Sequence, residues 1–220
     1  MIKAVIFDMD GVIIDSEPIH LQQNQELFHK WQLNLEKDIN LTLIGTNSNF
    51  KWKKLKKLYN LPMTVADLIK LDRGNYLKHL KDNSQNLKPI TGSLKLIKNL
   101  SQANYKLALA SSAPIEVIDI IIDTFKIRDC FDVIVSGDFV ARSKPEPDIF
   151  LLAANKLRVN VGSCLVIEDS KNGILAANKA KMKTIGYQGS NIYHQDLSQA
   201  DLIINSFKDF NIQLIRDLKS

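Results

Sequence analysis

The stretch KAVIFDMDG, residues 3–11, joins a short apolar run to two closely spaced carboxylates and a glycine. The apolar residues are partly β-branched and show little polar alternation, which is typical of a strand buried on both faces of a sheet. Asp8 and Asp10 lie two residues apart, so on extended backbone their side chains project to the same side. Like charges this close need a cation or a shared proton. Gly11 permits a tight turn whose N–H groups could face an anion.

Five further runs of this kind follow along the chain, and helix-like spacing separates most of them. The runs cover residues 106–110, 132–135, 164–167, 184–186 and 202–204. Helical patterns cover residues 93–103, 115–125, 148–156 and 171–180. This alternation predicts an α/β fold with a doubly wound, Rossmann-like parallel sheet.

Residues 16–87 interrupt that alternation, because they contain helix-period patterns without a buried strand. The patterns cover residues 19–33, 50–59 and 65–80. We therefore predict an all-helical cap domain, residues 16–87, inserted into a core made of residues 1–15 and 88–220. Pro18, Pro89 and Gly92 suit the two linkers. We expect the cap to close about these linkers and to expel water from the space beneath it.

Composition narrows the choice of partners. Of the 220 residues, 45% are hydrophobic and 24% are charged, which excludes a disordered or fibrous chain. The net charge of +5 would suit nucleic acid, anionic membrane or phosphate esters. Much of it lies in KWKKLKK, residues 51–57, where the spacing favours the solvated face of an amphipathic helix over a nucleic-acid site.

Signals for export or membrane insertion are missing from the sequence. No apolar run reaches the roughly 20 residues that span a bilayer, and residues 1–11 lack the pattern of a signal peptide. We expect a soluble, cytoplasmic monomer that binds neither nucleic acid nor a membrane.

Polar side chains follow the predicted strands at the edge of the sheet where ligands bind in such folds. Ser111 and Ser112 follow the second strand, where they could donate to a phosphate or cap a helix. Lys144 comes after the third strand and can supply a fixed positive charge. Glu168 and Asp169 end the fourth strand and add two carboxylates to the same edge. A hard cation with oxygen ligands, Mg²⁺ above all, would offset this crowding, and zinc is disfavoured because no Cys or His joins the group.

These residues together resemble a known family. DMDGV at residues 8–12, Ser111, Lys144-Pro145 and Glu168-Asp169 resemble, in order, the four motifs of the haloacid dehalogenase-like hydrolase superfamily. The predicted cap resembles that of the subgroup containing beta-phosphoglucomutase and many sugar-phosphate phosphatases, and DSEP at residues 15–18 is similar to its entrance.

The resemblance implies a two-step phosphoryl transfer with a small phosphorylated metabolite as the partner. Asp8 would be the nucleophile that forms an aspartyl-phosphate, and Asp10 the general acid and base. Ser111 and Lys144 would hold the phosphoryl oxygens.

The resemblance also implies a metal site and contacts from the cap. Mg²⁺ would be held by Asp8, the backbone carbonyl of Asp10 and Asp169, with Glu168 as a metal-shell or water-orienting carboxylate. The candidate substrate and cap contacts are Gly11, Glu17, His20 and Ser112. His20 matches a hinge histidine that would pair with Asp10, but an ordinary polar position on a helix explains it equally well.

Three departures bear on the reaction. Where the mutases carry a cap arginine, a cap lysine and a second phosphate-binding serine, this chain has TNS at residues 46–48, Asp72 beside Arg73, and Ala113. We therefore favour a Mg²⁺-dependent phosphatase of a small phosphate monoester, such as a sugar phosphate, over a sugar phosphomutase. A non-catalytic binding protein is the third alternative.

Overall fold

A computed structural model describes the chain except residues 37–38, 40–41, 190–194, 209, 211 and 219–220. Its centre is a six-stranded parallel sheet in the order β3-β2-β1-β4-β5-β6. The strands are β1 (Ala4–Phe7), β2 (Lys106–Ser111), β3 (Val133–Ser136), β4 (Cys164–Glu168), β5 (Lys183–Tyr187) and β6 (Leu202–Ile204). Each predicted strand is confirmed to within one residue at either end, and the doubly wound α/β fold is confirmed.

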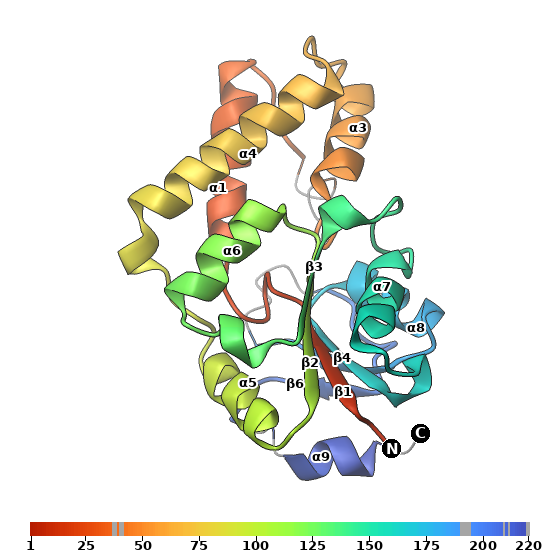
Figure 1. Cartoon of the computed structure of the whole chain (residues 1–220). Coiled ribbons are helices and arrows are strands. Elements are labelled where there is room, and N and C mark those ends of the chain that lie inside the picture. Colours follow the sequence, from red (N-terminus) through yellow and green to blue (C-terminus); the bar gives the residue numbers. More distant parts are fainter. Residues whose placement is uncertain (37–38, 40–41, 190–194, 209, 211, 219–220) are drawn as a thin grey trace.

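Helices cover both faces of the sheet (Figure 1). One face packs against α5 (Ser93–Gln102), α6 (Ile115–Thr124) and α9 (Ile212–Asp217), and the other against α7 (Asp148–Leu157) and α8 (Lys171–Lys179). The alternation of side chains along β1 divides the two apolar clusters, because Val5 and Phe7 belong to the first and Ala4 and Ile6 to the second. Both faces of β1 are thus buried, as its unbroken apolar sequence requires.

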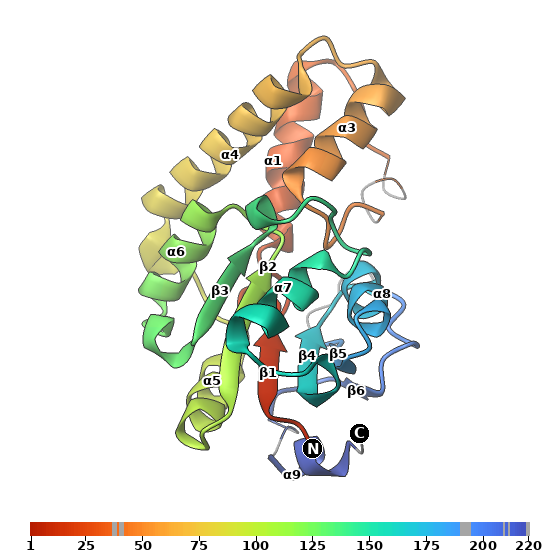
Figure 2. The same ribbon diagram turned by 45° about the vertical axis from the view of Figure 1, so that its right-hand side comes forward.

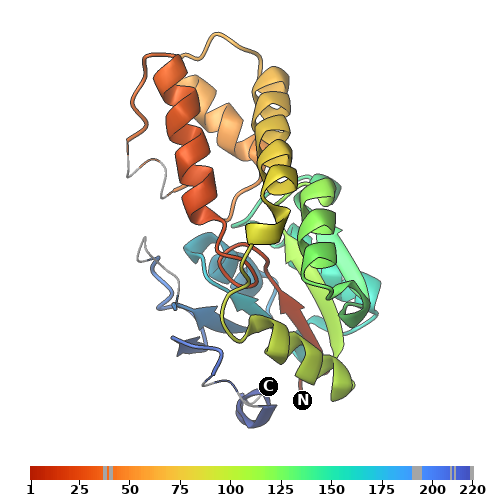
Figure 3. The ribbon, with the colours of Figure 1, turned by 90° about the vertical axis from the view of Figure 1, so that its left-hand side faces the viewer.

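Three helices form a separate layer beyond the carboxyl ends of the strands (Figures 2 and 3). They are α1 (Glu17–Lys30), α3 (Ser48–Tyr59) and α4 (Val65–Asp82). The layer has its own apolar cluster, which includes Leu27, Phe28, Trp52, Leu55 and Leu68. The inserted helical cap is confirmed as part of the fold, while its boundaries at residues 16 and 87 stay a prediction.

The ends of α1 differ from the sequence-based expectation. Pro18 lies in the first turn of α1, so its assignment to a linker is wrong. Proline is favoured in the first turn because its missing N–H would have no helical partner there. The helix stops at Lys30 rather than at Leu33, and Gln32 has a left-handed φ of 56° that ends the helical path. The short helix α9 was not predicted, since six residues carry too little periodicity.

Four of the connections contain a short 3₁₀ helix: η1 (Ser84–Asn86), η2 (Arg128–Cys130), η3 (Gly137–Phe139) and η4 (Val161–Ser163). None of the helices among the described residues combines the length and apolarity needed to cross a membrane.

Candidate active site

A tight turn after β1 brings Asp8 and Asp10 to the carboxyl edge of the sheet. The carbonyl of Met9 accepts from the N–H groups of Val12, Ile13 and Ile14, which folds the chain back on itself. Gly11 has a φ of +73°, and a Cβ there would lie 1.8 Å from Asp169 Oδ2. Glycine therefore lets the turn approach the end of β4, where Asp169 follows the strand.

A buried ion cluster lies beneath this turn. Lys144 Nζ donates to Asp8 Oδ1 at 2.9 Å and to Glu168 Oε1 at 2.6 Å. The side chains of Lys144, Asp8 and Glu168 are 1%, 6% and 0% exposed, so these charges are almost wholly removed from water. The second oxygen of Glu168 accepts from the N–H and hydroxyl of Ser170, which leaves both carboxylate oxygens occupied. A Cβ at Gly173 would lie 1.8 Å from Glu168 Oε1, so only glycine leaves room for this carboxylate.

The cluster has the donors and the charge for a divalent metal ion. Asp8, Glu168 and Asp169 each offer a carboxylate oxygen, and these oxygens lie within 4.8 Å of one another. Burial raises the pKa of Asp8, and the adjacent Lys144 opposes that rise. Carboxylates held this close are stabilised by a cation, and an all-oxygen donor set fits a hard cation.

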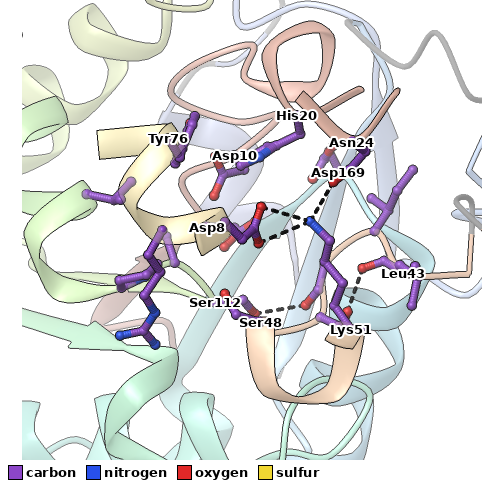
Figure 4. A pocket seen from close by; sticks show the side chains of 18 residues that line it. Asp8, Asp10, His20, Asn24, Leu43, Ser48, Lys51, Tyr76, Ser112 and Asp169 are labelled. Carbon is purple, nitrogen blue, oxygen red and sulfur yellow. Dashed lines mark hydrogen bonds and ion pairs between the residues drawn. The ribbon is translucent and has the colours of Figure 1, made fainter. Parts of the chain in front are cut away.

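Asp10 lies at the mouth of the same site. Its two oxygens accept from the hydroxyl of Ser16 and, at 3.4 Å, from Ser111 Oγ. His20 lies near Asp10 (Figure 4) and packs on Tyr76 with ring centroids 4.3 Å apart. Burial lowers the pKa of His20, although Asp10 opposes that effect. The lowered pKa favours the neutral imidazole, and the pairing of His20 with Asp10 stays a prediction.

The other predicted residues are placed as follows. Ser112 lines the cavity and donates to Gly45 O at 2.8 Å. Ser111 is buried, and its Oγ accepts from the N–H of Ala113. The alternative in which these serines cap the next helix is wrong, because Pro114 is the N-cap of α6 and no side chain caps it. Glu17 begins α1, and its side chain lies outside the described part of the structure.

The cap supplies one wall of the cavity (Figure 4). Asp8, Asp10 and Asp169 lie on the core side. Lys51 faces them from α3, and its Nζ donates to Asn24 Oδ1 at 2.8 Å and to Asp72 Oδ2 at 3.2 Å. The expectation that the whole lysine run forms a solvated face is wrong at Lys51, whose side chain is only 14% exposed.

Asp72 anchors this wall. Its Oδ2 also accepts from Trp52 Nε1 at 2.8 Å. Burial raises the pKa of Asp72, but Lys51 and Trp52 outweigh it and hold that pKa below its ordinary value. The carboxylate is thus ionised at pH 7. The sequence did not identify three of these site residues: Lys51, Asp72 and Asn24. The available signal was Asp72 itself, which stands where the mutases carry a cap lysine.

Hydrogen bonds hold the cap against the core. Besides Ser112 to Gly45, the N–H of Asn47 donates to Ser143 Oγ at 2.7 Å, and Asn172 Nδ2 donates to Ile44 O at 2.8 Å. The loop before α3 therefore contacts the segments that follow β2, β3 and β4. These three hydrogen bonds join the cap to the core at the strand ends.

Comparison with known proteins identifies the family of the chain. The model of the haloacid dehalogenase-like hydrolases matches residues 5–187. The chain belongs to this hydrolase family. It is 30% identical to beta-phosphoglucomutase of Bacillus subtilis, over 98% of this chain and 94% of that protein. It is also 30% identical to the phosphorylated carbohydrates phosphatase of Thermotoga maritima, over 83% of each chain.

A solved structure agrees in fold. CbbY from Rhodobacter sphaeroides, in complex with phosphate, superimposes with a TM-score of 0.85 at 26% identity, over 99% of this chain and 100% of that one. The haloacid dehalogenase-like chain described here is therefore an enzyme of a phosphatase and phosphomutase family.

Proposed function

We propose that the chain is a Mg²⁺-dependent phosphatase that hydrolyses a small phosphate monoester, such as a sugar phosphate, through an aspartyl-phosphate. The observation that carries this proposal is the meeting of Asp8, Asp10 and Asp169 in one cavity, with Lys144 bonded to Asp8 beneath it. The names of the relatives, two of which act on phosphorylated sugars, support the substrate class.

The first step transfers the phosphoryl group to the enzyme. A carboxylate oxygen of Asp8 attacks phosphorus, and the bond between phosphorus and the ester oxygen breaks. Asp10 gives its proton to the departing oxygen, which leaves as an alcohol. Lys144 stabilises negative charge on the phosphoryl oxygens, and Ser111 is the proposed hydroxyl donor to them. Mg²⁺, held by Asp8, Asp169 and the Asp10 carbonyl with Glu168 nearby, would supply a Lewis acid that offsets charge on the phosphoryl group.

The second step regenerates the enzyme. Asp10, now a carboxylate, accepts a proton from water while the water oxygen attacks phosphorus. The bond between phosphorus and the Asp8 oxygen breaks, and inorganic phosphate leaves. If a sugar hydroxyl replaces water in this step, the same residues perform the mutase reaction. We favour hydrolysis because residues 46–48 and Asp72 stand where the mutases carry a cap arginine and a cap lysine.

The test is phosphate release from a panel of sugar and nucleotide monophosphates, with Mg²⁺ and with a chelator. Asp8→Asn is the control, and we expect it to lower kcat by at least about 1,000-fold because it removes the nucleophile. Beta-glucose 1-phosphate is assayed in parallel for glucose 6-phosphate. Its conversion with little free phosphate would establish the mutase instead, and activity that survives Asp8→Asn would contradict the mechanism.

A further inference from the structure

The charges lining the cavity bear on what the far end of a substrate can be. Among the described residues, the carboxylates that line it are Asp8, Asp10, Asp72 and Asp169, and the cationic side chains are Lys51 and Arg73. His20 also lines it and packs on Tyr76. Asp8, Asp10 and Asp169 belong to the reacting end, so the charged side chains left for the far end of the substrate are Lys51, Arg73 and Asp72.

Both cationic groups already have carboxylate partners. Lys51 is paired with Asp72, and it also donates to the neutral oxygen of Asn24. Arg73 is paired with Asp138, which follows β3. A second phosphate that reached Lys51 would lie beside the ionised carboxylate of Asp72, and one that reached Arg73 would lie beside Asp138. Like charges in a cavity shielded from water repel more strongly than they do in bulk solvent.

The same side chains suit hydroxyl groups. Lys51 offers N–H donors, while Asp72 and Asn24 offer acceptor oxygens a few ångströms away. Arg73 adds a buried Nε–H that has no hydrogen-bond partner among the described residues. A sugar hydroxyl both donates and accepts, so it can join this alternating network without breaking an ion pair.

We propose that Lys51, Asp72 and Asn24 select phosphate monoesters whose far end is uncharged and hydroxylated, and that Asp72 disfavours substrates with a second phosphate. This proposal rests on the phosphatase activity proposed above and names its substrate class. Asp72 is a specificity-determining residue in this account, and it acts partly by neutralising Lys51.

The experiment compares matched pairs: glucose 1-phosphate with glucose 1,6-bisphosphate, and fructose 1-phosphate with fructose 1,6-bisphosphate. We expect the wild type to prefer the monophosphate in kcat/KM. Asp72→Asn keeps an oxygen for Trp52 and removes the charge, so it should shift the ratio toward the bisphosphate by about fivefold or more, the effect of one unit charge at contact distance. Lys51→Gln should shift the ratio the opposite way, because Asp72 then faces the substrate unpaired.

Matched controls carry the same chemical changes on the outer surface of the same helices. The control variants are Asp82→Asn on α4 and Lys53→Gln on α3. Both residues are exposed and lie outside the cavity. Neither should change the ratio. Misfolding would lower kcat/KM for both substrates of a pair by the same factor. The ratio of the two values therefore separates misfolding from a change in selectivity.

The outcomes are distinguishable from those of the function test. Para-nitrophenyl phosphate, which has no hydroxylated far end, reports the chemical step alone. Suppose that hydrolysis of this ester is lost in Asp8→Asn, but that the wild type prefers bisphosphates or Asp72→Asn has the wild-type ratio of kcat/KM values. The selectivity proposal then fails and the phosphatase proposal stands. If no ester in the panel is hydrolysed, the phosphatase proposal fails and the selectivity proposal fails with it.

Discussion

Two lysine–carboxylate pairs face each other across the cavity, one in the core and one in the cap. Lys144 lies below it with Asp8 and Glu168, at 1% side-chain exposure. Lys51 lies above it with Asp72, at 14% and 12% exposure. The lower pair is fixed by residues that follow strands, and the upper pair by side chains on two different helices. We expect the lower pair to control reaction and stability, and the upper pair to control substrate choice.

The difference in burial indicates how each pair responds to change. A buried charge that loses its partner is costly because it cannot recover its hydration. Lys144 serves two carboxylates that are almost unexposed, so neither can turn to water. Lys51 and Asp72 line the cavity, and each retains some exposure. The core pair should therefore be intolerant of substitution, while the cap pair can vary with the substrate.

The largest expected effect separates these two lysines directly. Lys144→Met leaves two buried carboxylates unpaired and should lower the free energy of unfolding by about 3–5 kcal/mol. Lys51→Met leaves only Asp72, which keeps its bond from Trp52, and should cost about 1–3 kcal/mol. Urea unfolding at pH 7 in the presence of a chelator measures both values. Equal losses of unfolding free energy in the two variants would contradict the distinction between the core pair and the cap pair.

The core site could be predicted from sequence because a parallel sheet brings strand ends together. Asp8, Glu168 and Asp169 are far apart in the chain, but each lies at or just after a strand whose apolar run is plain. Once β1 and β4 are neighbours, with Phe7 beside Ile167, the carboxylates must meet. The turn at Gly11 was likewise predicted, since its position follows directly from the end of the strand.

The cap wall could not be predicted because helix faces meet only after packing. Lys51 is adjacent to buried Trp52 on α3, about 100° around the helix from it. A residue at that angle can face either solvent or a neighbouring helix, and periodicity does not distinguish the two. Its partner Asp72 is 21 residues away on α4, so no local pattern joins them. The sequence therefore indicated a cap but not which side chains it turns toward the core.

A glycine substitution sharpens the comparison by disturbing the core pair without touching its charges. In Gly173→Ala the new Cβ would overlap the Glu168 carboxylate, which must move and carry Lys144 with it. We expect a loss of about 1–3 kcal/mol in unfolding free energy, the usual cost of overpacking, together with a lower kcat.

Gly74→Ala is its matched control in the cap, because nothing lies within 4 Å of the Cβ that it adds to α4. Alanine in a helix interior should raise the unfolding free energy by up to about 1 kcal/mol. Urea unfolding and phosphate release are measured for both variants. A Gly173→Ala protein with normal kcat and stability would show that the position of Glu168 is not tightly constrained.

The smallest expected effect is a pH dependence that belongs to the cap pair. Lys51 and Trp52 outweigh burial and hold the pKa of Asp72 below its unfolded value. A depressed carboxyl pKa stabilises the fold above the unfolded pKa, near 4, and that stability is lost as pH falls through the folded value. Asp72→Asn lacks the titrating group, so its deficit relative to wild type, about 1 kcal/mol at pH 7, should shrink below pH ~4. Urea unfolding of both proteins from pH 7 down to pH 3 tests this. A deficit that stays constant over that range would mean that packing of Asp72, and not its charge, holds the cap wall together.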